Sequence, residues 1–398
     1  MTARQRIKDF YLRSRGIALR AMPTSRGRSA AGEVSGDAIR RVLLIRLDRV
    51  GDVVLSTPAI EALKKRFPRA ELTVLVRPQT AALLENNPHV DRCVVLDPGA
   101  PAAERVRVLK GLRRRRFDLA VDPCVDWKLA SALIAWVSGA RVRIGYPCGG
   151  REAFFTTAAE LPGGNAHMTG VILGTLKPLG IDGLTPQPRV YLSPEERDRA
   201  AGWLAGQGRS GKPLVGIHPG AYYETQRWPA EHYAALADRL RGRVNVILFG
   251  GPADEGLVER IRSGIPGGAL AVVTPDIRRF AALLSCCRLL VCNNSGPLHV
   301  AAALGVTTVS FMGPTVKALW SPLGEGHVAL RMDGLPCIGC NRGVCPAGTL
   351  ECMRRITPDM AAEAVSSMVH ELQNPCSFDL VIASAVRADA PAVKRAGT

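Results

Sequence analysis

Several features are scarce or missing in this sequence of 398 residues, and each absence argues against a class of protein. No apolar run reaches the roughly 18 residues that cross a bilayer, so a transmembrane helix is not expected. Segment 1–33 is basic and lacks the continuous apolar core of a secretory signal, so we expect no export. Aromatic residues make up only 5% of the chain, few for the stacking platforms of nucleic-acid-binding proteins.

Acidic side chains are also scarce. The chain has 35 Asp and Glu against 52 Lys and Arg, which gives a formal net charge of +17. This charge favours an anionic partner, which could be nucleic acid, a phosphate-rich membrane surface or a phosphorylated substrate. In the basic extension 1–40, apolar residues fall on one face of a possible helix. That pattern suits an anionic membrane surface and equally suits a frayed tail.

A dinucleotide-binding fingerprint is missing after the first predicted strand. Residues 42–45 form an apolar run too short for a helix and typical of a strand buried on both faces, and helical spacing begins near Asp52. Only Gly51 is available for the tight turn between them, so nicotinamide chemistry loses support. Asp52 lies at the carboxyl end of this strand, where it could cap the helix or act as a general base.

Apolar runs and helical periods alternate twice along the chain, which predicts an α/β protein with two parallel sheets. We place a first Rossmann-like domain at 41–185 and a second at 190–372, separated by the Pro-rich stretch 183–189. Segment 375–398 is a predicted tail. Two such domains that face each other leave a central cleft, where ligands collect.

Four segments at predicted strand ends in the second unit carry Gly, Ser or His. Each alone is explained by an ordinary turn with a helix cap, but four on successive strand ends indicate a binding site. Segment 293–299 would expose backbone N–H groups at the start of a helix, which suits a diphosphate. Asp254 is a possible ribose partner. The four segments are 218–221, 249–252, 293–299 and 311–315.

Together these motifs resemble the ADP-heptose:lipopolysaccharide heptosyltransferases, glycosyltransferase family 9, over about residues 41–370. The resemblance implies a GT-B fold, with the acceptor on the first domain and the nucleotide-sugar on the second. It also implies inverting, metal-independent transfer of heptose from ADP-heptose to a lipopolysaccharide inner-core type acceptor. The motifs that carry it are 46–59, 216–221 with 227–229, 249–252, and 294–302 with 312–315.

The resemblance also assigns roles to residues. Asp52 matches the family's catalytic aspartate, which takes the proton of the acceptor hydroxyl, and Arg49 and Gly51 belong to the acceptor-side loop. The residues expected to bind the donor are Ala221, Tyr222, Gln226, Arg227, Gly250, Gly251, Asp254, Asn294, Ser295, Gly296, Pro297 and His299.

Two positions depart from the family's pattern. Gln226 stands where a donor-contacting lysine is usual, and Asn294 stands where an aspartate is common. Arg227 is the nearest cation, but on a regular backbone its side chain would point elsewhere. The loss of a cation and an anion from one site could mean a different donor sugar or weakened activity.

The eleven cysteines are an odd number, which favours reduced thiols in the cytosol. Four of them fall in the Cys-rich loop 337–352 and resemble a C-terminal pattern of the same family. Converging thiols could bind zinc, while structural thiols or opportunistic disulfides explain the spacing equally well. The four are Cys337, Cys340, Cys345 and Cys352.

Other functions stay open on the sequence alone. They are transfer from a different nucleotide-sugar, a GT-B nucleotide-sugar epimerase, and a non-enzymatic protein that binds nucleic acid or sugar nucleotides. We expect the heptosyltransferase, with a nucleotide-sugar and a lipid-linked anionic glycan as partners and without nucleic acid or a required cofactor. We expect it in the cytoplasm, peripherally associated with the inner membrane.

Overall fold

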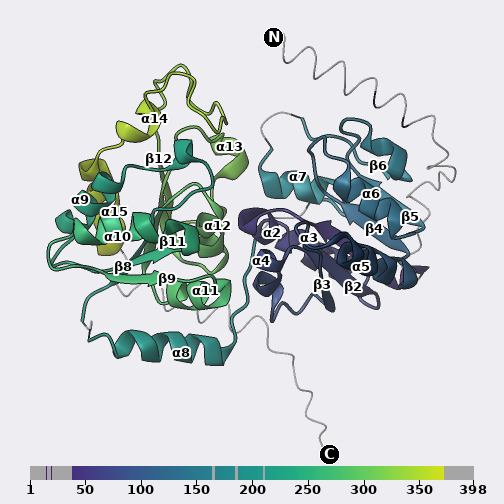
Figure 1. The fold of residues 1–398 in the computed structure, drawn as a ribbon, viewed down its shortest axis with the longest axis horizontal. Coiled ribbons are helices and arrows are strands. Elements are labelled where there is room, and N and C mark those ends of the chain that lie inside the picture. The colour runs from purple at the N-terminus through teal and green to yellow at the C-terminus, as the bar shows by residue number, and fades with distance from the viewer. Residues whose placement is uncertain are drawn as a thin grey trace, which may run out of the picture.

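The structure is a computed structural model that describes Arg15, Leu19 and residues 38–163, 166–183, 187–208 and 211–371. These residues form two lobes, each with a parallel six-stranded sheet flanked by helices (Figure 1). The predicted α/β class with two Rossmann-like units is therefore confirmed. The tail 375–398, nearly all of the basic extension 1–40 and the middle of the linker 183–189 lie outside the described residues.

The first lobe has the strand order β3-β2-β1-β4-β5-β6, with every pair parallel. Its strands are β1 (Arg41–Arg46), β2 (Glu71–Val76), β3 (Arg92–Val95), β4 (Leu119–Asp122), β5 (Val142–Gly145) and β6 (Thr157–Ala158). Its helices are α2 (Val50–Val54), α3 (Thr57–Arg66), α4 (Pro78–Ala81), α5 (Ala102–Arg114), α6 (Ala130–Val137) and α7 (Met168–Gly174), with 3-10 turns η3 (Ala82–Leu84), η4 (Arg151–Phe154) and η5 (Lys177–Leu179).

The continuous apolar run of β1 is explained by burial on both faces. Leu43 and Ile45 pack in the cluster under α5 and α6, whereas Val42 and Leu44 pack in the cluster under α3 and α7. The helix expected from Asp52 onward is in fact two helices. Pro58 in the first turn of α3 has no N–H for the carbonyl of Val54, which accepts from Thr57 Oγ1 at 2.8 Å instead.

The second lobe repeats the connectivity of the first, with the strand order β12-β11-β10-β7-β8-β9. Its strands are β7 (Leu214–His218), β8 (Asn245–Gly250), β9 (Leu270–Val273), β10 (Leu289–Asn293), β11 (Thr307–Phe311) and β12 (His327–Leu330). Its helices are α8 (Pro194–Ala205), α9 (Ala230–Arg239), α10 (Glu255–Ser263), α11 (Ile277–Ser285), α12 (Gly296–Ala303), α13 (Lys317–Trp320), α14 (Glu351–Arg354) and α15 (Pro358–Glu371), with 3-10 turns η6 (Glu224–Gln226) and η7 (Pro252–Asp254).

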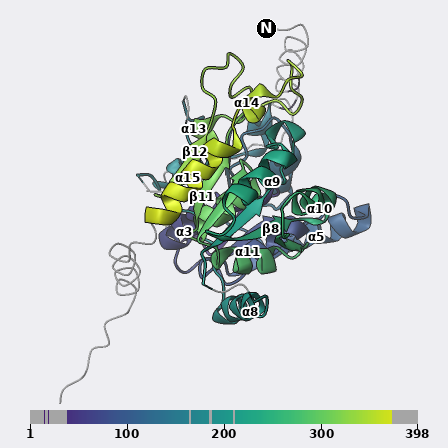
Figure 2. The same cartoon turned by 90° about the vertical axis from the view of Figure 1, so that its left-hand side faces the viewer.

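The two lobes are in direct contact. Helix α2 of the first lobe packs against α12 of the second, and one buried apolar cluster continues from Val54 to Leu298 across the boundary (Figure 1). His167 at the start of α7 donates from Nε2 to the carbonyl of Ser321 at 2.8 Å, because its Nδ1 already accepts from Thr169. On the outer face of the second sheet, α9 and α15 lie side by side (Figure 2). No helix in the described part of the chain is long and apolar enough to span a bilayer.

Candidate active site

A cavity of about 720 Å³ lies between the lobes, at the carboxyl ends of their central strands. Helix α2 forms its wall on the first lobe, and the segments after β7, β8 and β10 form its wall on the second. In each sheet this is where the strand order reverses, between β1 and β4 and between β7 and β10, the usual position of ligand sites in such sheets.

Every residue predicted for the base, the acceptor-side loop and the donor site lines this one cavity. The structure thus brings together positions that lie more than 200 residues apart in the chain. The residues are Arg49, Gly51 and Asp52 on the first lobe, and Ala221, Tyr222, Gln226, Arg227, Gly250, Gly251, Asp254, Asn294, Ser295, Gly296, Pro297 and His299 on the second.

Asp52 is the third residue of α2, and its side chain is 23% exposed toward the cavity. Its Oδ2 accepts the backbone N–H of Arg49 at 3.3 Å, a capping contact that fixes the carboxylate without hiding it. Capping and exposure to the cavity therefore coexist. Burial raises the pKa of Asp52 above its ordinary value, and the opposing effect of Arg46 does not cancel it.

Arg46, the last residue of β1, is buried directly behind Asp52. Its guanidinium lies 2.9 Å from Asp48 and 3.5 Å from Oδ1 of Asp52, and its Nε donates to the backbone carbonyl of Asp52 at 3.3 Å. Arg46 opens the motif 46–59, but its role could not be predicted, because a charged side chain at a strand end gives no signal of which carboxylates it will contact.

Gly51, predicted in a loop, is the second residue of α2, which begins at Val50. The reason for a glycine here is close approach of the other lobe. A Cβ on Gly51 would lie 2.9 Å from Cδ2 of His299, and a Cβ on Gly296 would lie 2.9 Å from Cβ of Val50. The starts of α2 and α12 thus meet with no room for a side chain at either glycine.

Asn293 connects the loops on the donor side. Its Nδ2 donates to the carbonyl of Pro219 at 2.7 Å, and its Oδ1 accepts the backbone N–H of Trp228 at 2.9 Å. Helix α12 then begins at the cavity wall, and its N-cap residue Ser295 makes no side-chain capping bond. The first turn of α12 therefore keeps its positive end toward the cavity.

The two positions that depart from the family's pattern have clear surroundings. Asn294 donates from Nδ2 to the carbonyl of Trp320 at 2.9 Å, a bond that an aspartate could not donate. Nε2 of Gln226 lies 3.4 Å from Oγ1 of Thr315.

Arg227 lines the cavity together with Gln226, and the direction of its side chain relative to a bound donor stays a prediction. The 3-10 turn η6 (Glu224–Gln226) breaks the regular alternation just before it. The guanidinium of Arg227 donates twice to the carbonyl of Ala221, at 2.9 and 3.1 Å.

Burial favours the neutral form of both histidines of the cavity. Burial lowers the pKa of His299 to about 3, and burial also lowers the pKa of His218. Positive charge on the lining side chains therefore comes from Arg49 and Arg227. Arg49 reaches across the cleft, with its guanidinium carbon 3.4 Å from the centre of the Tyr222 ring.

The Cys-rich loop contributes to the same cavity through Asn341, whose N–H donates to the carbonyl of Pro314 at 2.6 Å. All ten cysteines of the described residues are free thiols. Within those residues no group of three or more His, Cys, Asp or Glu side chains is arranged to hold a metal. Burial, and after it the neighbouring thiols Cys337, Cys340 and Cys345, raise the pKa of Cys352, and the zinc hypothesis for these four residues stays a prediction.

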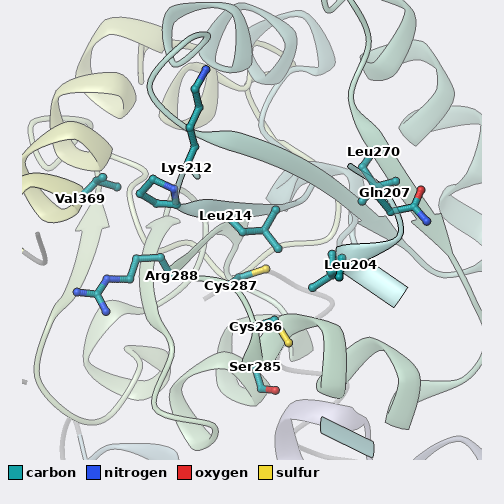
Figure 3. A pocket seen from close by; sticks show the side chains of 12 residues that line it. Leu204, Gln207, Lys212, Leu214, Leu270, Ser285, Cys286, Cys287, Arg288 and Val369 are labelled. Carbon is teal, nitrogen blue, oxygen red and sulfur yellow. The ribbon is translucent and has the colours of Figure 1, made fainter. Parts of the chain in front are cut away.

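A second hollow, of about 680 Å³, lies at the opposite edge of the second sheet (Figure 3). Leu214, Leu270 and Arg288 line it at or next to the first residues of β7, β9 and β10, away from the strand ends that carry the predicted site. Cys286 and Cys287 face it, and burial raises the pKa of both thiols, so neither is an activated nucleophile.

The sequence model described as "Glycosyltransferase family 9 (heptosyltransferase)" matches residues 105–350. The chain belongs to glycosyltransferase family 9. Lipopolysaccharide heptosyltransferase 3 of Escherichia coli is 31% identical over 296 residues, which cover 70% of this chain and 85% of that protein. The resemblance that the motifs indicate is thereby confirmed.

Solved structures of family 9 share the two-lobed fold. A family 9 glycosyltransferase from Veillonella parvula superposes with a TM-score of 0.73 at 23% identity, covering 83% of this chain and 97% of that one. The E. coli ADP-heptose lipopolysaccharide heptosyltransferase II gives a TM-score of 0.70 at 23% identity, with coverages of 84% and 99%. The predicted GT-B architecture is confirmed.

Several residues of the cavity escaped the sequence analysis. Phe280 of α11 has helical spacing typical of core residues, Trp320 ends the four-residue helix α13, and Asn341 lies in the Cys-rich loop after β12. Thr315 closes the predicted strand-end segment 311–315 but was given no role of its own.

Proposed function

We propose that the protein is an inverting glycosyltransferase that moves a heptose from ADP-heptose to a lipopolysaccharide inner-core type acceptor. The observation that carries this proposal is the shared cavity, in which Asp52 of one lobe faces the phosphate-suited start of α12 on the other. The names of the E. coli relatives, lipopolysaccharide heptosyltransferase 3 and ADP-heptose lipopolysaccharide heptosyltransferase II, support the same donor and acceptor. We assign the acceptor to the lobe 41–185 and the donor to the lobe 190–372.

Asp52 is the proposed general base. Its carboxylate takes the proton of the acceptor hydroxyl as that oxygen attacks the anomeric carbon, while the bond from this carbon to the diphosphate oxygen breaks and ADP leaves. A raised pKa makes the carboxylate a stronger base, and the hydrogen bond from the N–H of Arg49 orients it. A single displacement of this kind inverts the configuration at the anomeric carbon.

The donor side stabilises the charge that develops on the leaving diphosphate. The positive start of α12 at Ser295 and Gly296 offers backbone N–H groups, and Arg227 adds a full charge at the cavity wall. The neutral state of His299 limits that residue to hydrogen bonding and packing. In this proposal the reaction needs no metal, and Asp254 contacts the ribose.

A lipid-anchored acceptor would place the protein at the cytoplasmic face of the inner membrane, bound peripherally. The net charge of +17 supports attraction to such an anionic surface.

Calorimetry with ADP-, UDP- and GDP-linked sugars tests the donor. We expect ADP-heptose to bind at least about tenfold more tightly than the UDP- and GDP-linked sugars, a difference of about 1.4 kcal/mol. Preference for a UDP- or GDP-sugar would contradict the assigned donor. Incubation with the donor alone is the companion test, since interconversion of the sugar without an acceptor would identify an epimerase instead.

Arg46 is a positioning residue, and replacing it should shift the pH profile. Arg46 lowers the pKa of Asp52, so Arg46→Met should raise that pKa further and move the acid limb of kcat/KM to higher pH. Arg46→Lys keeps the charge and should restore most of the shift. A Met variant that folds, loses activity evenly at every pH and shows no displaced limb would exclude this role.

Gly296→Val should impair transfer without destabilising the fold. The added side chain would overlap Val50 across the cleft and separate α2 from α12, so we expect kcat/KM to fall about 10- to 100-fold. Gly256→Val on α10 is the matched control, because a Cβ there meets no atom within 4 Å. Equal activity of the two variants would show that the close approach is not needed for catalysis.

A further inference from the structure

We infer that the outer face of helices α5 and α6 is the surface by which this protein docks on an anionic lipid bilayer. Both helices pack on the same face of the first sheet, where Leu112 of α5 and Ile134 of α6 share a buried cluster with Leu43 of β1. The two helices contact each other, so their outward faces adjoin.

The α6 part of this surface is apolar. Leu133 and Trp136 are 42% and 40% exposed, and they lie three residues apart on the outward face of the helix. Trp127, in the segment that leads into α6, is 43% exposed. Three large apolar side chains on one short stretch leave considerable apolar area in water, and tryptophan is typical of side chains that sit at a bilayer interface.

The α5 part of the surface is cationic. Its exposed residues include Arg107, Lys110 and Arg114, and Glu104 is the only acidic residue of the helix. Arg113 joins the two parts, because its guanidinium donates to the carbonyl of Val137 at 3.3 Å. Within the basic run 113–116 some charge is used locally, as in the 2.7 Å pair of Arg115 with Glu71.

Two acidic side chains near this surface, Asp126 and Asp118, are paired with cations, Asp118 with Arg141 at 3.5 Å. Asp126 lies 3.5 Å from Arg151 and 3.7 Å from Lys128, and Asp118 accepts from the backbone N–H groups of Arg40 and Arg41. A cationic strip beside exposed tryptophan and leucine matches lipid headgroups with an apolar boundary beneath them. Nucleic acid would account for the arginines but leave Leu133 and Trp136 without a role.

The position of the surface fits an acceptor held in the same membrane. Trp127 follows β4 and Asp52 follows β1, and these strands are parallel neighbours. Trp127 therefore lies at the edge of the sheet that carries the proposed base, and α6 with Leu133 and Trp136 leads from there toward the opposite edge. The inference rests on the proposed function for the identity of the acceptor, whereas docking itself can be measured without catalysis.

Flotation of the full-length protein with vesicles tests the inference. The vesicles contain one part phosphatidylglycerol to two parts phosphatidylethanolamine, and pure phosphatidylcholine serves as the neutral reference. We expect wild type to float only with the anionic vesicles, and both Leu133→Ser/Trp136→Ser and Arg107→Glu/Lys110→Glu/Arg114→Glu to bind at least about tenfold more weakly. The matched control Arg241→Glu/Arg243→Glu/Arg260→Glu makes the same charge change on exposed positions of the second lobe and should lose much less.

Equal loss in the control and the α5 variant would overturn the inference, because binding would then follow net charge alone. Wild-type binding by both the α6 double variant and the α5 triple variant would overturn the inference as well. So would a preference of the wild-type protein for an oligonucleotide over the vesicles. Transfer to a deacylated, water-soluble acceptor separates docking from function. Wild type that floats as expected but transfers no heptose would refute the proposed function and leave the docking surface supported.

Discussion

Asp52→Asn is expected to lower kcat for heptose transfer by about two to four orders of magnitude, the range that a positioned general base contributes. The amide keeps the size of the side chain and an oxygen for the N–H of Arg49, but it cannot take the acceptor's proton. The affinity for ADP-heptose should change little, since Asp52 lies on the opposite lobe from the donor segments. Steady-state kinetics and calorimetry measure the two effects separately.

Asp48→Asn is the matched control for this variant. Asp48 pairs with the same arginine at 2.9 Å, but it is not among the residues that line the cavity. We expect it to retain most of the activity. Turnover unchanged in Asp52→Asn, or lost equally in both variants, would contradict the assignment of the base.

Trp228→Ala is expected to destabilise the second lobe by about 3–5 kcal/mol, the usual cost of truncating a buried aromatic residue. The Trp228 ring stacks on Phe311 with centroids 4.1 Å apart and meets Tyr233 edge to face at 4.8 Å. Its Nε1 donates to the carbonyl of Ile356 at 2.8 Å. Urea denaturation followed by circular dichroism measures the free energy of unfolding.

Trp228→Phe should cost clearly less than the alanine variant, because it keeps much of the stacking and loses the hydrogen bond to Ile356. A loss below about 1 kcal/mol in Trp228→Ala would contradict a core role, since that is the average effect of any point substitution. Trp228 belongs to the motif 227–229, so this prediction separates its packing role from the donor contacts proposed for its neighbour Arg227.

The order of strands and helices could be predicted because the parallel strands are buried on both faces. Runs such as those of β1 and β8 are short, apolar and separated by clear helical periods. The elements that the sequence did not reveal lack this signal. Strand β12 is only half-buried along its length, and α13 and α14 have four residues each, too few to show a period.

The position of the candidate site could also be predicted, since it needs only the rule that ligands bind at the carboxyl ends of parallel strands. The geometry within the site could not. Nothing local in the sequence shows that Arg46 would lie behind Asp52, or that α2 and α12 would approach closely enough to require Gly51 and Gly296. These are contacts between distant segments, and the docking of the two lobes determines them.

The surroundings of the two departures from the family's pattern could not be predicted either, because they also depend on contacts with other segments. Asn294 seemed to remove a charge from the donor site, but its amide donates to the carbonyl of Trp320, which a carboxylate could not do. Arg227 lines the cavity just after the 3-10 turn η6, and its guanidinium donates to the carbonyl of Ala221 in the same segment. The sequence at a single position does not show which backbone carbonyl its side chain will bind.

The anomeric configuration of the transferred heptose tests the central claim most directly. Purified protein is incubated with ADP-heptose and a deacylated inner-core acceptor, and nuclear magnetic resonance compares the new glycosidic bond with the donor's bond to diphosphate. We predict one heptose added per acceptor with the configuration inverted, as a single displacement with Asp52 as base requires. Retained configuration, or release of ADP without a glycosylated product, would contradict the mechanism.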